Sequence, residues 1–208
     1  MLDLNEIKLK TFIKTKKIYP NKAIKIICSL NDINLSRQKF HIILYVKTNL
    51  ENKNVILQKI KINLNKVVIE GGLTIIPLEF KISSSTPISI HKSNVWIETY
   101  LKSEKQNILK EKYNINVLPP LYIENIINIL ERKGYFLTEV YNNRLNKELN
   151  RFYISQSFNF KKNKNKLELI FKNNVDFTEL ILNNKTIFLD NKYLNDIKYL
   201  KNKIYLNI

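Results

Sequence analysis

The chain has 208 residues, of which 44% are hydrophobic and 11% aromatic, so it can form a globular core and is not of the disordered class. It carries 35 Lys and Arg residues against 18 Asp and Glu, a formal net charge of +17. This charge has two possible explanations. It attracts the protein to anionic surfaces, or it only reflects the lysine-rich composition that an AT-rich genome encodes. The basic residues are spread over both halves of the chain, which favours composition over a dedicated basic arm.

The cysteine content and the N-terminus indicate a reducing compartment. Cys28 is the one cysteine, so no disulfide can form within the chain, and it lies in the apolar run Ile24–Leu30. We therefore expect a buried, unreactive thiol. Residues 1–6 lack the basic region and apolar core of a signal peptide, and no apolar run approaches the length of a membrane span. The sequence thus predicts a soluble, cytoplasmic protein.

Up to residue 118 the chain is a series of short strands in which apolar and polar residues alternate. Only 3 glycines are present, so we expect asparagine in many turns, and the Gly71-Gly72 pair marks another turn. The expected strands are Ile7–Phe12, Ala23–Leu30, Lys39–Thr48, Val55–Leu64, a segment from Ile76 to Ile82, Val95–Leu101 and a segment from Tyr113 to Val117. Six or seven such strands predict an immunoglobulin-like antiparallel β-sandwich.

Trp96, the only tryptophan, lies in the expected strand Val95–Leu101, and two interpretations are open. In the first it is buried in the sandwich core, where a large aromatic side chain can fix two sheets against each other. In the second it is exposed and anchors a binding partner. We expect the first.

Pro119-Pro120 ends the strand pattern, and the period of the apolar residues changes to that of a helix. The new spacing of three and four predicts an amphipathic helix over Leu121–Lys133, and Gly134 stands where a helix C-cap belongs. The side chains expected on the buried face of this helix are Ile123, Ile126, Ile127 and Leu130. We place a domain boundary here, with a first domain of residues 1–118 and a second of residues 119–208.

After the helix the strand pattern resumes. The expected strands are Phe136–Tyr141, Phe152–Phe160, Leu167–Lys172, Leu180–Leu182 and Thr186–Leu189. The segment Tyr193–Ile208 fits a helix and a strand equally well. The overall prediction is a mainly β fold, a sandwich followed by a helix and a second, smaller β-rich domain.

The sequence contains no phosphate-binding loop, no nucleophile elbow and no His or Cys spacing typical of zinc. We interpret His41 and His91 as structural residues, and the acidic residues, Glu98 among them, as a scattered, solvated set. We therefore expect no enzyme activity, no cofactor and no metal.

Two lysine-rich segments are candidate contacts for an anionic surface, either a membrane or a nucleic acid. Both are expected in solvated loops. Their lysines are Lys14, Lys16 and Lys17 in the first segment and Lys161, Lys162, Lys164 and Lys166 in the second.

Several segments, in this order, resemble the bacterial sporulation-control (SpoOM) family. They are Thr86–Ile88 with Lys92–Thr99, Lys112–Pro119, Ile126–Glu139, and Tyr153–Phe160 with Leu167–Phe171. The resemblance implies an arrestin-like N-terminal sandwich, a helical link and a second β-rich domain. It also implies a regulatory, non-catalytic role in sporulation or the cell cycle through protein contacts. His91 stands where the family has a glycine, and this chain is basic where family members tend to be acidic.

From this resemblance we expect an adaptor that holds a protein partner at its sandwich loops or exposed edge strands, by strand addition. The same edges would also allow a homodimer. The alternative is a peripheral binder of anionic membrane or nucleic acid, based on the charge of +17 and the two lysine segments. One contiguous basic face would support the alternative, whereas lysines spread all round would not.

Overall fold

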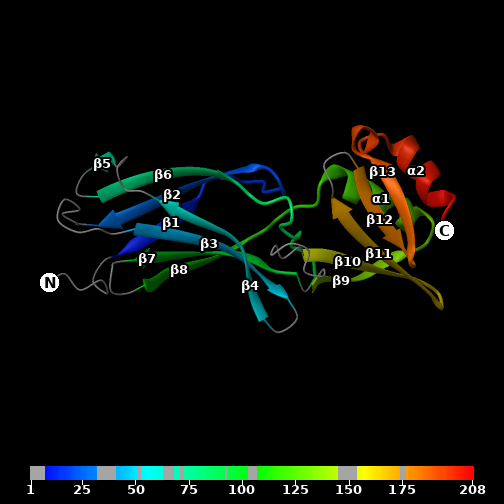
Figure 1. The fold of residues 1–208 in the computed structure, drawn as a ribbon, viewed down its shortest axis with the longest axis horizontal. Helices are drawn as coiled ribbons and strands as arrows, with labels where there is room; N and C mark the ends of the chain where they lie inside the picture. The colour runs from blue at the N-terminus through cyan, green and yellow to red at the C-terminus, as the bar shows by residue number, and fades with distance from the viewer. Residues whose placement is uncertain are drawn as a thin grey trace.

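The computed structural model describes residues 8–31, 41–50, 53–62, 68–70, 73–91, 93–102, 107–144, 154–173 and 177–208. In these residues the fold is mainly β, with three antiparallel sheets and two α-helices (Figure 1). The predicted mainly β fold, a sandwich followed by a helix and a further β-rich part, is confirmed.

Two four-stranded sheets form the sandwich in the N-terminal half. The first has the order β1 (Leu9–Ile13), β2 (Ala23–Asn31), β6 (Leu73–Lys81), β5 (Val68–Glu70). The second has the order β4 (Lys53–Ile62), β3 (His41–Leu50), β7 (Val95–Lys102), β8 (Asn107–Ile115). The short strand β5 was not predicted, and the expected turn at Gly71-Gly72 lies outside the described residues.

The core of the sandwich consists of alternate side chains from both sheets. On β2 these are Ile24, Ile26, Cys28 and Leu30, all at most 1% exposed, as the alternation predicts. They share one hydrophobic cluster with Leu44 and Val46 of β3 and with Ile97 of β7. Full burial of each such side chain favours folding by roughly 1.5–3 kcal/mol, so this cluster holds the two sheets together.

Cys28 lies in this core with 0% of its surface exposed, and burial raises the pKa of its thiol to about 11. The thiolate is the reactive form of cysteine. We therefore expect a thiol reagent at about pH 8, below the ordinary cysteine pKa, to label the urea-unfolded chain completely while native Cys28 stays unlabelled. Mass spectrometry of samples taken over time would measure both rates, and similar rates would contradict the buried position.

Helix α1 (Leu121–Arg132) begins directly after Pro120 and ends at a Schellman motif. Gly134 has φ +84°, and its N–H donates to the carbonyl of Glu131 at 2.8 Å. The N–H of Tyr135 donates to the carbonyl of Leu130 at 3.0 Å. Because the positive φ is unfavourable for a residue with a Cβ atom, glycine is favoured at this position.

The buried face of α1 differs from the prediction in one residue. Ile123, Ile126 and Leu130 are buried as expected, but the fourth buried residue is Ile129, whereas Ile127 is only half-buried. On a helical projection the buried arc is centred on Ile126, which leaves Ile127 at its border. The spacing of apolar residues thus located the helix, but the rotation about its axis is set by the sheet against which it packs.

The C-terminal sheet is a meander in which each strand pairs with its neighbour in sequence. Its strands are β9 (Phe136–Arg144), β10 (Ile154–Lys162), β11 (Asn165–Asn173), β12 (Phe177–Leu182) and β13 (Lys185–Asp190). Asparagine residues make two of its turns, as expected, with positive φ at Asn163, Asn183 and Asn184.

A 3₁₀ helix (Asn191–Tyr193) and helix α2 (Ile197–Tyr205) follow β13, so the segment that fitted either a helix or a strand is helical. The carboxylate of Asp196 caps α2 by accepting hydrogen bonds from the N–H groups of Lys198 and Tyr199. Leu200 and Ile204, four residues apart, are buried, and they join α2 to the core of the meander.

Ile88 and Ser93, which lie between β6 and β7, contact the C-terminal half. Ile88 belongs to the hydrophobic cluster of the meander and α1, although it lies well before residue 118. The division at residue 118 stays a prediction. His91 has φ +54°, a left-handed conformation that is uncommon for a residue other than glycine or asparagine.

A buried polar network, the polar seam, joins the halves through the side chains of Thr48, Ser93, Asn142 and Gln156. Gln156 accepts a hydrogen bond from the N–H of Ile88 at 2.7 Å, and its amide donates to the Ile88 carbonyl at 2.9 Å and to Ser93 Oγ at 3.0 Å. Ser93 donates to Asn142, whose amide donates to Thr48 Oγ1 at 3.0 Å. The seam thus fixes β9 and β10 against the end of β3.

Candidate functional site

The outer face of the sheet β4-β3-β7-β8 carries a cluster of aromatic and charged side chains. We call it the aromatic–basic face and define it by Tyr45, Lys47, Lys59, Trp96, Glu98, Tyr100 and Lys112. Along β7, Val95 and Ile97 point into the sandwich core, so Trp96, Glu98 and Tyr100 point to the other side. Trp96 is 4% exposed, so its predicted burial is confirmed. It does not belong to the core between the two sheets, which is the position that we expected from the sequence.

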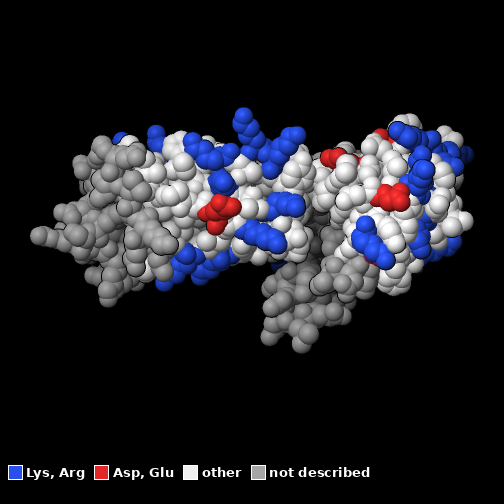
Figure 2. Space-filling model, turned by 90° about the horizontal axis from the view of Figure 1, so that it is seen from above, with Lys and Arg blue, Asp and Glu red and all other residues white. Residues whose placement is uncertain are grey.

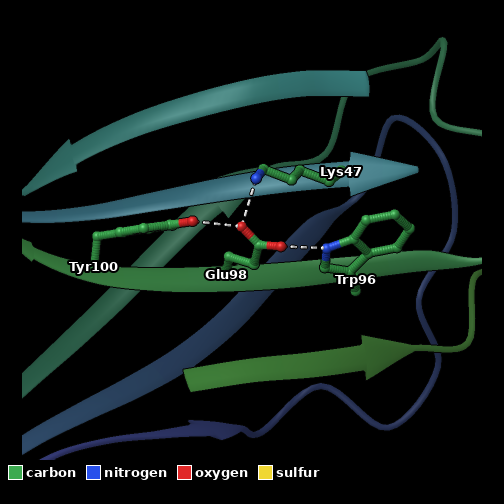
Figure 3. Close-up of polar contacts among 4 residues, drawn as sticks. All are labelled: Lys47, Trp96, Glu98 and Tyr100. Carbon is green, nitrogen blue, oxygen red and sulfur yellow. Dashed lines mark hydrogen bonds and ion pairs between the residues drawn. The ribbon is translucent and has the colours of Figure 1, made fainter. Parts of the chain in front are cut away.

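Glu98 stands at the centre of this face and is only 7% exposed. Its Oε1 accepts a hydrogen bond from Trp96 Nε1 at 2.8 Å, and its Oε2 accepts one from the Tyr100 hydroxyl at 2.8 Å (Figure 3). Lys47 Nζ also donates to Oε2, at 2.5 Å (Figure 3). The expectation that Glu98 is a solvated acid is therefore wrong, because three neighbouring donors replace water around the carboxylate.

These contacts determine the charge states of the cluster. Burial by itself raises the pKa of Glu98, but the hydrogen bonds from Lys47, Trp96 and Tyr100, with the charge of Lys47, outweigh it and leave the pKa below its ordinary value of 4.5. Burial and the neighbouring Glu98 raise the pKa of Tyr100 to about 12. Glu98 is therefore a carboxylate at neutral pH, and Tyr100 remains a hydroxyl donor to it.

Lysine ammonium groups lie against the aromatic rings of this face. The rings of Tyr45 and Tyr100 meet edge to face with centroids 5.4 Å apart, and Lys47 Nζ lies 5.6 Å from the Tyr45 centroid. Lys59 Nζ is 5.9 Å from the ring of Tyr45, and Lys112 Nζ is 4.5 Å from that of Trp96. These lysines partly cover the rings, so the rings are poor platforms for stacked bases.

The pairing of the strands places these side chains in a row across the sheet. Lys59 of β4 pairs with Tyr45 of β3, Tyr45 with Glu98 of β7, and Glu98 with Lys112 of β8. Since Lys47 neutralises the one carboxylate of this face, the row presents Lys59 and Lys112 as exposed positive charges. The arrangement can bind carboxylate groups by charge and hydrogen bonds.

The described part of the chain holds no group of three His, Cys, Asp or Glu side chains that could ligate a metal ion. None of the helices described is both long and apolar enough to cross a membrane.

The two lysine segments predicted as anionic-surface contacts lie in separate parts of the fold. Lys14, Lys16 and Lys17 are exposed in the connection from β1 to β2, which lies beside the chain leading to α1 (Figure 1). There Lys14 lines a shallow hollow with Lys25 and Glu79.

The second segment forms the β10–β11 hairpin end, where Lys161, Lys162, Lys164 and Lys166 are exposed. The structure does not bring the two segments together, and their role as anionic contacts stays a prediction. On the face that Figure 2 shows, lysines are spread over both halves with acidic residues between them.

Comparison with known proteins identifies relatives of this fold. The family model described as SpoOM protein matches residues 9–185. The crystal structure of Spo0M, sporulation control protein, from Bacillus subtilis matches with a TM-score of 0.79 and 18% identity over 96% of both chains. No curated protein sequence matches the chain.

A cycloalternan-forming enzyme from Listeria monocytogenes, in complex with a pentasaccharide substrate, gives a TM-score of 0.32 at 8% identity. That match covers 83% of this chain and 13% of the enzyme, and it is too weak to indicate a common fold.

Proposed function

This chain belongs to the SpoOM protein family, as its sequence resemblance predicted, and from this premise we propose that it is a regulatory protein without enzyme activity that binds a protein partner. Its relative from Bacillus subtilis is described as a sporulation control protein. The corresponding role here is control of sporulation or the cell cycle in the cytoplasm, as an adaptor.

The observation that supports this proposal is the buried carboxylate of Glu98 under the aromatic–basic face. Three hydrogen bonds hold Lys47, Trp96 and Tyr100 in fixed positions, so these side chains lose little conformational entropy when a partner binds. Tyrosine is also enriched at protein interfaces, and Tyr45 and Tyr100 are half-buried on this face. A rigid surface of this composition suits a protein partner better than a small substrate.

The charge of the face indicates an acidic partner. Lys59 and Lys112 contact aromatic rings, and no ion pair with a described acidic side chain is found for either. Carboxylates of a partner would therefore meet available positive charge. β4 lies at the edge of the sheet, and its Ile56 is 52% exposed next to this lysine row. An extended acidic segment that adds to β4 as a strand would reach Lys59.

The test is a quantitative pull-down from extract of the native host with the full chain and two matched double variants. We expect the wild type to enrich a specific acidic protein, and Lys59→Glu with Lys112→Glu to reduce its recovery at least about ten-fold, since close charge pairs at interfaces contribute strongly. The control, Lys16→Glu with Lys17→Glu, makes the same charge change in the β1–β2 connection and should bind nearly as wild type.

Two results of the pull-down would contradict the proposal, and a measurement of the oligomeric state could supply a third. One is recovery of only abundant anionic proteins that are lost at moderate salt. The other is an equal loss from both double variants, because a specific site on the aromatic–basic face would distinguish them. A chain that dimerises through β4 instead would show a second copy of itself as the occupant of this edge and would also overturn the proposal.

A further inference from the structure

Helix α2 has an exposed apolar side that the proposed function does not use. Its inner side chains, Leu200 and Ile204, are buried. On the outside, the exposed fractions are 40% for Ile197, 42% for Tyr205, 83% for Leu206 and 46% for Ile208. Residues 197, 201 and 205 recur at a spacing of four, so they form one stripe along α2, while Leu206 is the C-cap and Ile208 follows the end of the helix. We call Ile197, Lys198, Lys201, Tyr205, Leu206 and Ile208 the α2 surface.

The α2 surface is also basic. Residues 197–208 contain three lysines and no acidic residue. The preceding acid, Asp196, accepts hydrogen bonds from the first turn of α2, and a negative charge there stabilises the helix. Lys133, the C-cap of α1, adds a further ammonium group 4.1 Å from the Tyr205 ring centroid. Figure 2 shows that lysine and arginine side chains gather over the end of the molecule where Figure 1 places β13 and α2.

We propose that the α2 surface binds the interface of an anionic phospholipid bilayer. Lys198 and Lys201 would meet the phosphate groups, while Ile197, Tyr205, Leu206 and Ile208 enter the boundary between headgroups and acyl chains. Exposed aliphatic and aromatic side chains beside lysines on a surface helix and at its C-terminal end are typical of interfacial helices. A nucleic acid would satisfy the lysines but leave the aliphatic side chains in water. The prominence of Leu206 therefore favours a lipid surface.

The expected binding is weak and reversible, because the surface is one short helix whose inner side remains packed on the protein. Each lysine near an anionic bilayer strengthens binding about five-fold at low salt. The apolar side chains contribute independently of salt, so binding should fall with ionic strength to a residual level that depends on Leu206.

Sedimentation of the full chain with lipid vesicles tests the proposal. Vesicles with about one-third phosphatidylglycerol should bind the protein, whereas phosphatidylcholine vesicles should bind it at least ten-fold more weakly. Lys198→Glu with Lys201→Glu should weaken binding to the anionic vesicles more than about ten-fold. Leu206→Ser should abolish the residual binding at high salt. The matched control, Lys16→Glu with Lys17→Glu, should change binding less than about two-fold, because those lysines lie away from α2.

Circular dichroism melts of the variants would verify that they fold, since the substituted side chains are exposed or half-exposed. Equal losses of vesicle binding from the two double variants would overturn the proposal, because the net charge of the chain, and not the α2 surface, would then determine binding. Absence of binding to anionic vesicles would also overturn it. So would binding of duplex DNA, if the α2 double variant loses DNA binding to the same extent as vesicle binding. The inference is independent of the aromatic–basic face, so the α2 variants should still capture the protein partner.

Discussion

Replacing Glu98 by alanine is expected to lower the free energy of unfolding by roughly 3–5 kcal/mol, the loss typical of removing one partner from a buried ion pair. The change leaves the ammonium of Lys47, 16% exposed in its side chain, without its carboxylate. It also removes the acceptor of Trp96 Nε1 and of the Tyr100 hydroxyl. Urea unfolding followed by tryptophan fluorescence would measure the effect, since Trp96 is the only tryptophan.

The matched control is Glu79→Ala on the opposite sheet. Glu79 pairs with Lys25 at 3.8 Å, but their side chains are 57% and 68% exposed. Exposed pairs of this kind contribute at most about 1 kcal/mol, because water and salt screen them. Equal losses from the two variants would mean that the Glu98 cluster is no more important to stability than an ordinary surface pair.

The effect of Glu98→Ala should also depend on pH. The pKa of Glu98 is lower in the folded protein than its ordinary value of 4.5, so folding favours the ionised form. The stabilisation is fully present above the unfolded pKa and is lost as the pH falls through the folded pKa. The difference between wild type and variant should therefore be constant near neutral pH and shrink in acid. A difference that grows in acid would contradict the ionised carboxylate.

The second large effect is expected at the polar seam. Gln156→Ala should destabilise the protein by roughly 2–5 kcal/mol, because it leaves the N–H and the carbonyl of Ile88 unpaired and each such buried group costs about 1–3 kcal/mol. Gln156→Glu should be no better, because one of its carboxylate oxygens would face the Ile88 carbonyl. Thermal melts of both variants would measure the loss.

Gln58 provides the control for this prediction, since its side-chain amide also bonds one backbone carbonyl and one backbone N–H, but nearer to solvent. It donates to the carbonyl of Lys81 at 3.0 Å and accepts from the N–H of Ser83 at 3.3 Å. Water can replace both contacts, so Gln58→Ala should cost less than about 1 kcal/mol. A larger loss from Gln58→Ala than from Gln156→Ala would show that the seam does not stabilise the junction of the halves.

The sequence predicted most of the strands but not the face on which the candidate site lies. Alternation along β7 separates Val95 and Ile97 from Trp96 and Glu98, but it does not say which set points inward. We assigned the large aromatic residue to the core on its hydrophobicity alone. The spacing of Trp96, Glu98 and Tyr100, two residues apart, was the available signal, since it puts two donors and an acceptor on one side of a strand.

Other parts of the fold depend on contacts between distant residues. The pairing of Ile88 with Gln156 joins residues 68 positions apart, and no local pattern marks either residue as a partner of the other. By contrast, α2 has a local signal in the sequence. Asp196 is a favourable N-cap, and Ile197, Leu200 and Ile204 follow at helical spacing. Local patterns therefore locate elements, and the tertiary contacts decide their orientation.

The meander of β9 to β13 has a consequence for the order of folding. Each of its strands pairs with the next one in the chain, so the sheet can grow by closing short loops. The sandwich instead pairs β2 with β6, which first requires Asn31 to meet Leu73. Since low contact order accelerates folding, the meander should form first when the whole chain refolds from denaturant. During synthesis on the ribosome the sandwich emerges first, so the half that folds more slowly can begin to fold before the meander is complete.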